Sequence, residues 1–91
     1  MISRSDQLTV LSRIIIPLID VAEEKSYKIT FNAYTNFCSF AICYKFDKNI
    51  YQSWSCFYDA THDWDCENGH FRTFESMKEI LLTIREALEN E

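Results

Sequence analysis

The stretch FCSFAICYKF-DKN-IYQSWSCFY, residues 37–58, contains two runs in which large apolar residues alternate with smaller or polar ones. A period of two is typical of β-strands that bury one face and expose the other. Between the runs lies Asp47-Lys48-Asn49, which suits a three-residue hairpin loop because Asn49 tolerates the left-handed backbone conformation. We therefore predict a β-hairpin here, and we expect the rest of the chain to bury its apolar face.

A third strand is predicted just before this hairpin, at Tyr27–Tyr34, where apolar and polar residues also alternate. A two-residue turn at Thr35-Asn36 would place Phe31 opposite Phe40, Ile29 opposite Ile42, and Tyr27 opposite Tyr44. The loop at 47–49 would place Phe46 opposite Ile50, Ile42 opposite Trp54, and Phe40 opposite Cys56. Both turns put the same residues of the middle strand on one face, which favours a three-stranded antiparallel meander.

Helices are predicted at both ends of the chain. Residues 3–24 begin with a capping serine, Ser3 or Ser5, and carry apolar residues at steps of three and four. Pro17 removes one backbone hydrogen bond and should kink this helix. The apolar surface of this helix is wider than one stripe. The helix is therefore either a kinked core helix or one that also binds a partner or a second copy through this surface. The final helix should follow Thr73 as its N-cap.

Residues 63–73 predict a second, shorter hairpin, because Asn68-Gly69 suits a type I′ turn. This turn would pair Glu67 with His70, Cys66 with Phe71, and Asp65 with Arg72. Taken together, the elements predict one α+β domain over residues 1–91, in the two-layer order α-β-β-β-(β-hairpin)-α. Its antiparallel meander sheet would be packed on one face by two helices.

Composition limits the class of protein. A hydrophobic content of 47% and an aromatic content of 15% argue against disorder. The longest apolar run, Ile14–Ile19, is too short to span a membrane, and the N-terminus lacks the pattern of a secretory leader. We therefore expect a cytoplasmic protein. The four cysteines form no C-x-x-C pair and are interpreted as free thiols of a reducing compartment.

Charge is unevenly distributed along the chain. Residues 1–58 hold six Lys/Arg and five Asp/Glu, whereas residues 59–91 hold three and nine. An acidic segment of this kind disfavours nucleic acid and anionic membranes as partners, and it favours a basic protein surface. Such charge also simply promotes solubility.

Two groupings between residues 62 and 70 have side chains that bind metals. His62, Cys66 and His70 are of the types that hold zinc, but the predicted hairpin turns His70 away from the other two, and no fourth ligand is near. We therefore expect no zinc site.

The second grouping is Asp63, Asp65 and Glu67, whose carboxylates share one strand face and could bind Mg²⁺ or Ca²⁺. The residues at positions 68 and 74 depart from the EF-hand pattern, so a solvated acidic strand is expected, with no cofactor. With one glycine and no nucleophile elbow, we do not expect an enzyme. A metal-dependent enzyme built around residues 62–70 is the least favoured alternative.

The order of one helix, three strands and one helix resembles the double-stranded RNA-binding domain. Such domains contact phosphates with basic residues around their second helix. Here that helix opens with Thr73-Phe74-Glu75-Ser76 and has only Lys78 as an early base, so nucleic-acid binding is not expected.

The outward face of the predicted meander holds aromatic residues and few charges, as the cores of protein interfaces do. An exposed Ser/Thr-rich sheet with scattered aromatics is the alternative. Small acidic single-domain chains resemble phage or mobile-element inhibitors of host machinery, including anti-CRISPR proteins. That resemblance implies a non-enzymatic module that occludes a basic, nucleic-acid-binding surface of a target protein. The alternative is a homodimeric structural or regulatory protein. The predicted partner-binding residues are Asp59, Asp63, Asp65, Glu67, Tyr34, Tyr51 and Phe57.

Overall fold

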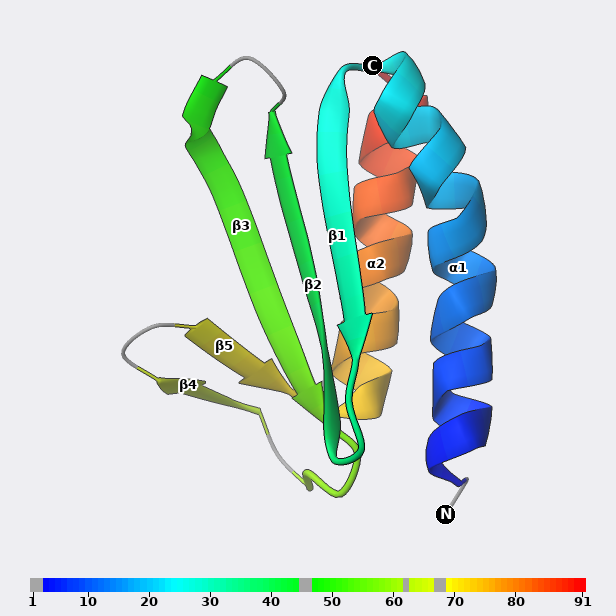
Figure 1. The fold of residues 1–91 in the computed structure, drawn as a ribbon, viewed down its shortest axis with the longest axis vertical. Coiled ribbons are helices and arrows are strands. Elements are labelled where there is room, and N and C mark those ends of the chain that lie inside the picture. The colour runs from blue at the N-terminus through cyan, green and yellow to red at the C-terminus, as the bar shows by residue number, and fades with distance from the viewer. Residues whose placement is uncertain (1–2, 45–46, 62, 67–68) are drawn as a thin grey trace.

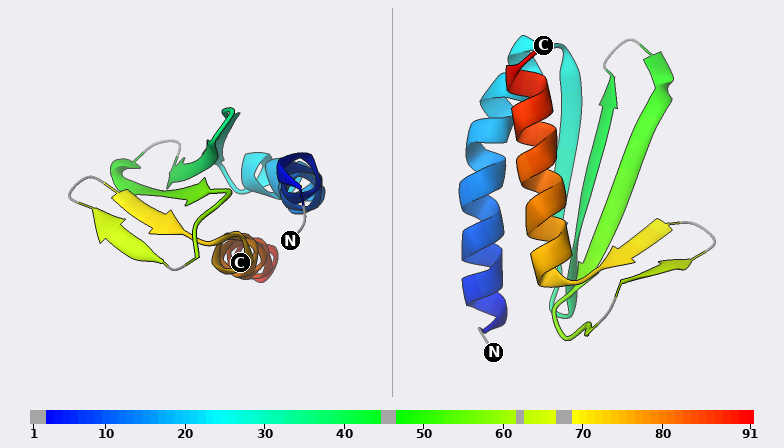
Figure 2. Two further views of the ribbon diagram at one scale, coloured as in Figure 1. Left: turned by 90° about the horizontal axis from the view of Figure 1, so that it is seen from below. Right: turned by 180° about the vertical axis from the view of Figure 1, so that it is seen from behind.

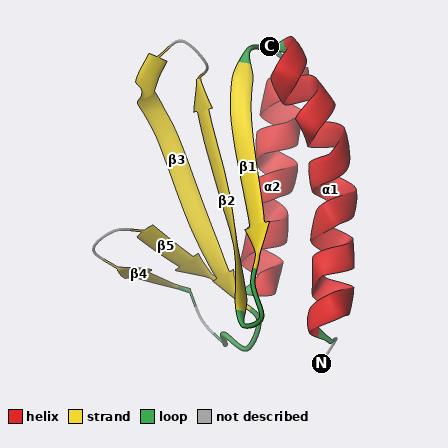
Figure 3. Ribbon diagram, viewed as in Figure 1, coloured by secondary structure: helices red, strands yellow, loops and turns green. Residues whose placement is uncertain are grey.

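The computed structural model describes residues 3–44, 47–61, 63–66 and 69–91, and at 44, 47–51, 64–66 and 69–70 it describes the backbone alone. The elements in chain order are α1 (Arg4–Glu24), β1 (Tyr27–Ala33), β2 (Phe37–Tyr44), β3 (Asp47–Phe57), β4 (Trp64–Cys66), β5 (Gly69–Arg72) and α2 (Phe74–Glu89). The strands form one sheet in the order β1-β2-β3-β5-β4. Both helices lie on one side of this sheet (Figures 1 and 2). The predicted α+β class and its helix–strands–helix order are confirmed (Figure 3).

Both helices begin at the predicted caps. The side chain of Ser3 accepts a hydrogen bond from the backbone N–H of Asp6, and that of Thr73 accepts one from Ser76, each at 3.2 Å. These bonds satisfy N–H groups that have no partner within the first helical turn. Helix α1 continues through Pro17, and Figure 1 shows its last turns leaning toward β1. No helix in the described part of the chain is long and apolar enough to cross a membrane.

The hairpin of β1 and β2 has the predicted register. The pairs Tyr27–Tyr44, Ile29–Ile42 and Phe31–Phe40 all form. At the turn, the backbone N–H of Tyr34 donates to the carbonyl of Phe37 at 2.8 Å. A two-residue turn therefore sufficed to fix which face of each strand is buried.

The predicted register of β2 against β3 is wrong by two residues. Phe40 pairs with Trp54 and Cys38 with Cys56, while Ile42 pairs with Gln52. The predicted loop at 47–49 belongs to β3, which begins at Asp47, while β2 ends at Tyr44 and residues 45–46 lie outside the described ones.

A register shift accompanies this change: Cys43 pairs with Tyr51, but the next residue, Tyr44, pairs with Asp47. The observed pairing sets aromatic residues opposite one another on both faces: Phe40 against Trp54 toward the helices, and Phe37 against Phe57 on the other face. Because side chains alternate with a period of two, a shift of two residues leaves Phe37–Ile42 and Gln52–Phe57 on their predicted faces.

The second hairpin forms as β4 and β5, but its predicted register is also wrong by two residues. Trp64 pairs with Phe71, Asp65 with His70, and Cys66 with Gly69. Gly69 lies in a strand without the positive φ that a type I′ turn needs, and residues 67–68 lie outside the description. Strand β5 joins β3 in parallel, so the sheet is mixed where the sequence predicted antiparallel pairing alone.

The core lies between the helices and the sheet. Its fully buried residues come from both layers: Leu11, Leu18, Cys38, Phe40, Cys56, Met77 and Leu81. Two isoleucines of α1, Ile16 and Ile19, are instead 63% and 46% exposed. The broad apolar surface predicted for α1 is therefore only partly covered by its own fold.

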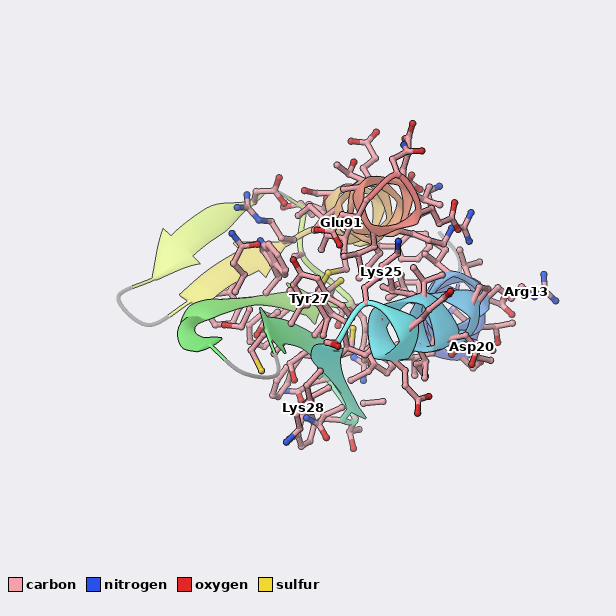
Figure 4. All side chains as sticks on the ribbon, turned by 90° about the horizontal axis from the view of Figure 1, so that it is seen from above. Arg13, Asp20, Lys25, Tyr27, Lys28 and Glu91 are labelled. Carbon is pink, nitrogen blue, oxygen red and sulfur yellow. The ribbon has the colours of Figure 1, made fainter. Side chains whose placement is uncertain are left out.

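The end of α2 is tied to the junction between α1 and β1. Lys25 donates a hydrogen bond to the backbone carbonyl of Glu91 at 2.8 Å, and the Tyr27 hydroxyl donates to the Glu91 carboxylate at 3.2 Å (Figure 4). Ser26 lies between them with φ 67°, the left-handed conformation that commonly ends a helix. The two bonds to Glu91 hold the end of α2 against this junction.

Candidate binding face

Four aromatic rings form a continuous row across the sheet. The ring centroids of Tyr34 and Phe37 lie 4.6 Å apart, those of Phe37 and Phe57 lie 5.4 Å apart, and those of Phe57 and Phe71 lie 4.9 Å apart. The chain neighbours Cys38 and Cys56 are buried in the core, so alternation places Phe37 and Phe57 on the face away from the helices. We call Tyr34, Phe37, Phe57 and Phe71 the aromatic row.

The aromatic row joins segments that are distant in sequence. It begins just after β1, crosses β2 and β3, and ends on β5. Tyr34 and Phe57 were predicted as partner-binding residues, whereas Phe71 was not. Phe71 reaches the row only because β5 pairs in parallel with β3, where Ser55 is its register partner. No local pattern around Phe71 indicates that neighbour.

Stacking gives the row a defined shape. Each pair of rings at such distances contributes about 0.5–1.5 kcal/mol beyond the burial of its area. Tyr34 is 52% exposed, while the three phenylalanines are half-buried against one another and the strands. Large, ordered aromatic groups lose little conformational entropy on binding, so this surface suits contact with another macromolecule.

Hydrogen bonds from Tyr58 and Arg4 hold the turn that carries Tyr34. The Tyr58 hydroxyl donates to the Tyr34 carbonyl at 3.2 Å, and the Tyr58 backbone N–H donates to the Asn36 carbonyl at 3.3 Å. Arg4 donates to the carbonyl of Thr35 at 3.0 Å. Tyr58 is buried, and this desolvation, with smaller contributions from Cys38 and Cys56, raises its pKa to about 12. Its hydroxyl therefore remains a hydrogen-bond donor at neutral pH.

The two described acidic residues of the predicted site lie where helices begin. Asp59 accepts a hydrogen bond from Arg4 at 2.8 Å, beside the start of α1. Asp63 accepts one from the backbone N–H of Thr73 at 2.7 Å, and its carboxylate lies 3.9 Å from Arg72. Carboxylates near helix N-termini also interact favourably with the helix dipole. Both residues therefore contribute to the fold, and the side chain of Asp59, at 69% exposure, still presents charge to solvent.

Several residues discussed in the sequence analysis lie outside the described part of the structure. At Tyr51, Asp65, Cys66 and His70 only the backbone is described, and His62 and Glu67 are not described at all. Among the side chains that are described, no group of three or more His, Cys, Asp or Glu could hold a metal ion.

The described cysteines are free thiols in two settings. Cys38 and Cys56 face each other across β2 and β3 inside the core, and Cys43 lies half-buried on the opposite face. A hydrogen bond with Cys38 and burial raise the pKa of the Cys56 thiol far above its usual range. The same hydrogen bond lowers the pKa of the Cys38 thiol. Both side chains are completely buried, so the pair contributes to the packing of the core.

Comparison of the chain with protein-family models, with curated proteins and with solved structures finds no match to any of them.

Proposed function

We propose that this protein is a small non-enzymatic binding module that covers a surface of another protein with its aromatic row. The observation that supports this is the row itself: four neighbouring aromatic rings on the one sheet face that no described helix covers. Aromatic residues are enriched at the centres of protein interfaces. The free thiols fit a protein that works in the reducing cytoplasm.

The charge of the chain favours a basic partner surface. The net charge of the chain is −5, and nine of the fourteen acidic residues lie between positions 59 and 91. Asp59 is the described member of this segment that is both exposed and near the turn of Tyr34, through Arg4 and Thr35. Negative charge beside an apolar contact surface steers encounter with a positive patch. We propose that the partner surface is one that otherwise binds nucleic acid, as an anti-defence inhibitor would require.

The first test is capture of partners from the native host, followed by mass spectrometry, with matched variants of the full chain. Tyr34→Ser with Phe57→Ser removes two rings of the row. Leu82→Ser removes an apolar side chain of α2 that is 39% exposed. A partner captured by the wild type and by Leu82→Ser, but lost with the double variant, is expected. Equal capture by the double variant, shown to be folded by circular dichroism, would contradict a role for the row.

The second test uses the purified partner. Loss of a central interface ring typically weakens binding by ~2 kcal/mol or more, about thirtyfold. Asp59→Lys should mainly slow association and reduce its salt dependence. If occlusion is the mechanism, saturating amounts of this protein should displace nucleic acid from the partner. A ternary complex of the three would show that the module binds without occluding.

A further inference from the structure

Strand β1 is one edge of the sheet, and α1 runs alongside it (Figure 1). It ends the strand order β1-β2-β3-β5-β4, and all seven of its residues pair one-to-one with β2 without a bulge. It contains no proline, and its one charged residue is Lys28. The opposite edge, β4, is only three residues long. Natural proteins usually shorten, bend or cover a long regular edge, because its free backbone groups pair readily with another strand.

The backbone groups directed toward this edge can be identified. Tyr34 bonds to Phe37 at the turn, and bonded pairs alternate along an antiparallel ladder. Thr30 therefore directs its N–H and carbonyl toward β2, whereas Ile29 and Phe31 direct theirs toward the free edge. Within the described sheet, no strand lies on that side to receive them.

Beside the edge lies an apolar groove between β1 and α1, with a volume of about 540 Å³. Its apolar lining includes Ile15, Ile16 and Ile19 from the helix and Ile29 and Phe31 from the strand. Ile16 and Ile19 are the two exposed isoleucines of α1. An occupant that pairs with β1 would thus also cover exposed apolar side chains of the helix.

A two-fold axis through the midpoint of β1 would also pass close to the middle of this helical patch. The midpoint of β1 is Thr30, four residues or ~13 Å along the strand from Ser26. The helix runs back from the same junction, and ~13 Å corresponds to about nine residues, which reaches position 17. Ile16 and Ile19 lie on either side of that position. One axis would therefore bring β1 against its own copy, and Ile16 and Ile19 against theirs.

Charge is complementary about the same axis. Arg13 and Asp20 lie almost equally far from position 17, in opposite directions along α1. Both are exposed on the side of the helix away from α2 (Figure 4), and neither forms an ion pair within the described residues. In an antiparallel pair of helices, Arg13 of each copy would approach Asp20 of the other. A C2 interface requires self-complementarity of this kind.

We propose that the β1–α1 face binds a second copy of this chain. The two β1 strands pair antiparallel about Thr30, so that Ile29 of one copy exchanges backbone hydrogen bonds with Phe31 of the other. The two sheets become continuous, and the two α1 helices pack side by side through Ile16 and Ile19. Two Arg13–Asp20 ion pairs form between the two helices. The aromatic row lies on the other face of the sheet and remains open in the dimer.

A cross-link tests the strand register directly. Thr30 would face its own copy in a non-hydrogen-bonded pair, where Cα atoms lie ~4.5 Å apart, within disulfide range. In a background with Cys43→Ser and Cys66→Ser, Thr30→Cys should therefore form a dimer on a non-reducing gel after mild oxidation of the native protein. Asn32→Cys is the matched control, because its two copies would be four positions out of register, ~13 Å apart. Cross-linking of Asn32→Cys and not of Thr30→Cys would overturn this register.

Charge reversal tests the helical contact without disturbing the core. The wild type should sediment with about twice the chain mass of 10.8 kDa at high micromolar concentration. Arg13→Asp and Asp20→Arg should each weaken self-association by roughly tenfold or more, since each juxtaposes like charges twice. The double variant should restore it. Glu79→Arg, which makes the same charge change on the exposed face of α2, should have no effect.

A wild type that remains monomeric at those concentrations would overturn the proposal, and so would single reversals that leave the dimer intact. This inference is independent of the proposed function. Loss of partner capture in the Tyr34→Ser/Phe57→Ser variant with an unchanged dimer would support both.

Discussion

The hydroxyl of Tyr58 donates a hydrogen bond to the backbone carbonyl of Tyr34, 3.2 Å away. The donor is the buried first residue of the connection after β3, and the acceptor lies in the turn that holds the first ring of the aromatic row. A residue of the core thereby fixes the position of an exposed aromatic side chain 24 positions earlier in the chain.

Removing this hydroxyl should destabilise the protein. Tyr58→Phe leaves the ring in place but deletes the donor, so the free energy of unfolding should fall by about 1 kcal/mol. The change is measured by urea denaturation. Tyr34→Phe is the matched control, because the exposed Tyr34 hydroxyl is not the bonded group, and its effect should stay within ~0.5 kcal/mol. Equal losses in the two variants would show that the bond to the carbonyl contributes nothing.

Tyr58 also predicts a loss of stability at high pH. Burial raises its pKa to about 12, whereas an unfolded tyrosine titrates near 10. The folded state then binds more protons than the unfolded state between these values, so stability is complete below about pH 10 and falls as pH rises toward 12. The slope is at most ~1.4 kcal/mol per pH unit for one group. Unfolding measured from pH 9 to 12 should show it, and a curve for Tyr58→Phe parallel to that of the wild type would refute the assignment to Tyr58.

The acidic residues beside the helices should differ in their contributions to stability. Asp63 accepts a bond from the backbone N–H of Thr73, so Asp63→Ala should cost about 1–2 kcal/mol. Asp59 is an exposed partner of Arg4, and Asp59→Ala should cost less than ~1 kcal/mol. Thermal unfolding at neutral pH compares the two. A larger effect at Asp59 would mean that its ion pair, rather than the contact at α2, holds the connection in place.

The two faces of the sheet should respond differently to truncation of an aromatic ring. Phe40 is fully buried, so Phe40→Ala should destabilise the fold by ~3–5 kcal/mol through lost burial and a cavity. Phe57→Ala removes a half-buried ring of the aromatic row and should cost clearly less. Denaturant titration of both variants checks this order, and a reversed order would place the principal core on the other face.

Thiol labelling should separate the described cysteines by burial. In a Cys66→Ser background, Cys43 should react with an aromatic disulfide reagent in the native protein, since it is only half-buried. Cys38 and Cys56 should react only as the protein unfolds, because both are completely buried. Rapid native labelling of three thiols would show that the core between β2 and β3 opens readily.

Local patterns in the sequence determined much of this structure. The caps at Ser3 and Thr73 and the turn at Thr35-Asn36 were predicted correctly, because each depends on residues a few positions apart. The buried and exposed faces of the central strands were also predicted correctly, even though the register of β2 against β3 was wrong. Alternation specifies a face, and a slip of two residues does not change it.

The tertiary structure alone decided the remaining features. Three features depend on which distant segments meet: the register shift between Cys43 and Tyr44, the parallel pairing of β5 with β3, and the position of Phe71 in the aromatic row. The exposure of Ile16 and Ile19 depends likewise on where β1 ends the sheet. The pattern of neighbouring residues predicts which side chains can be buried. Whether another element covers them is determined only by the packing of segments that are distant in the sequence.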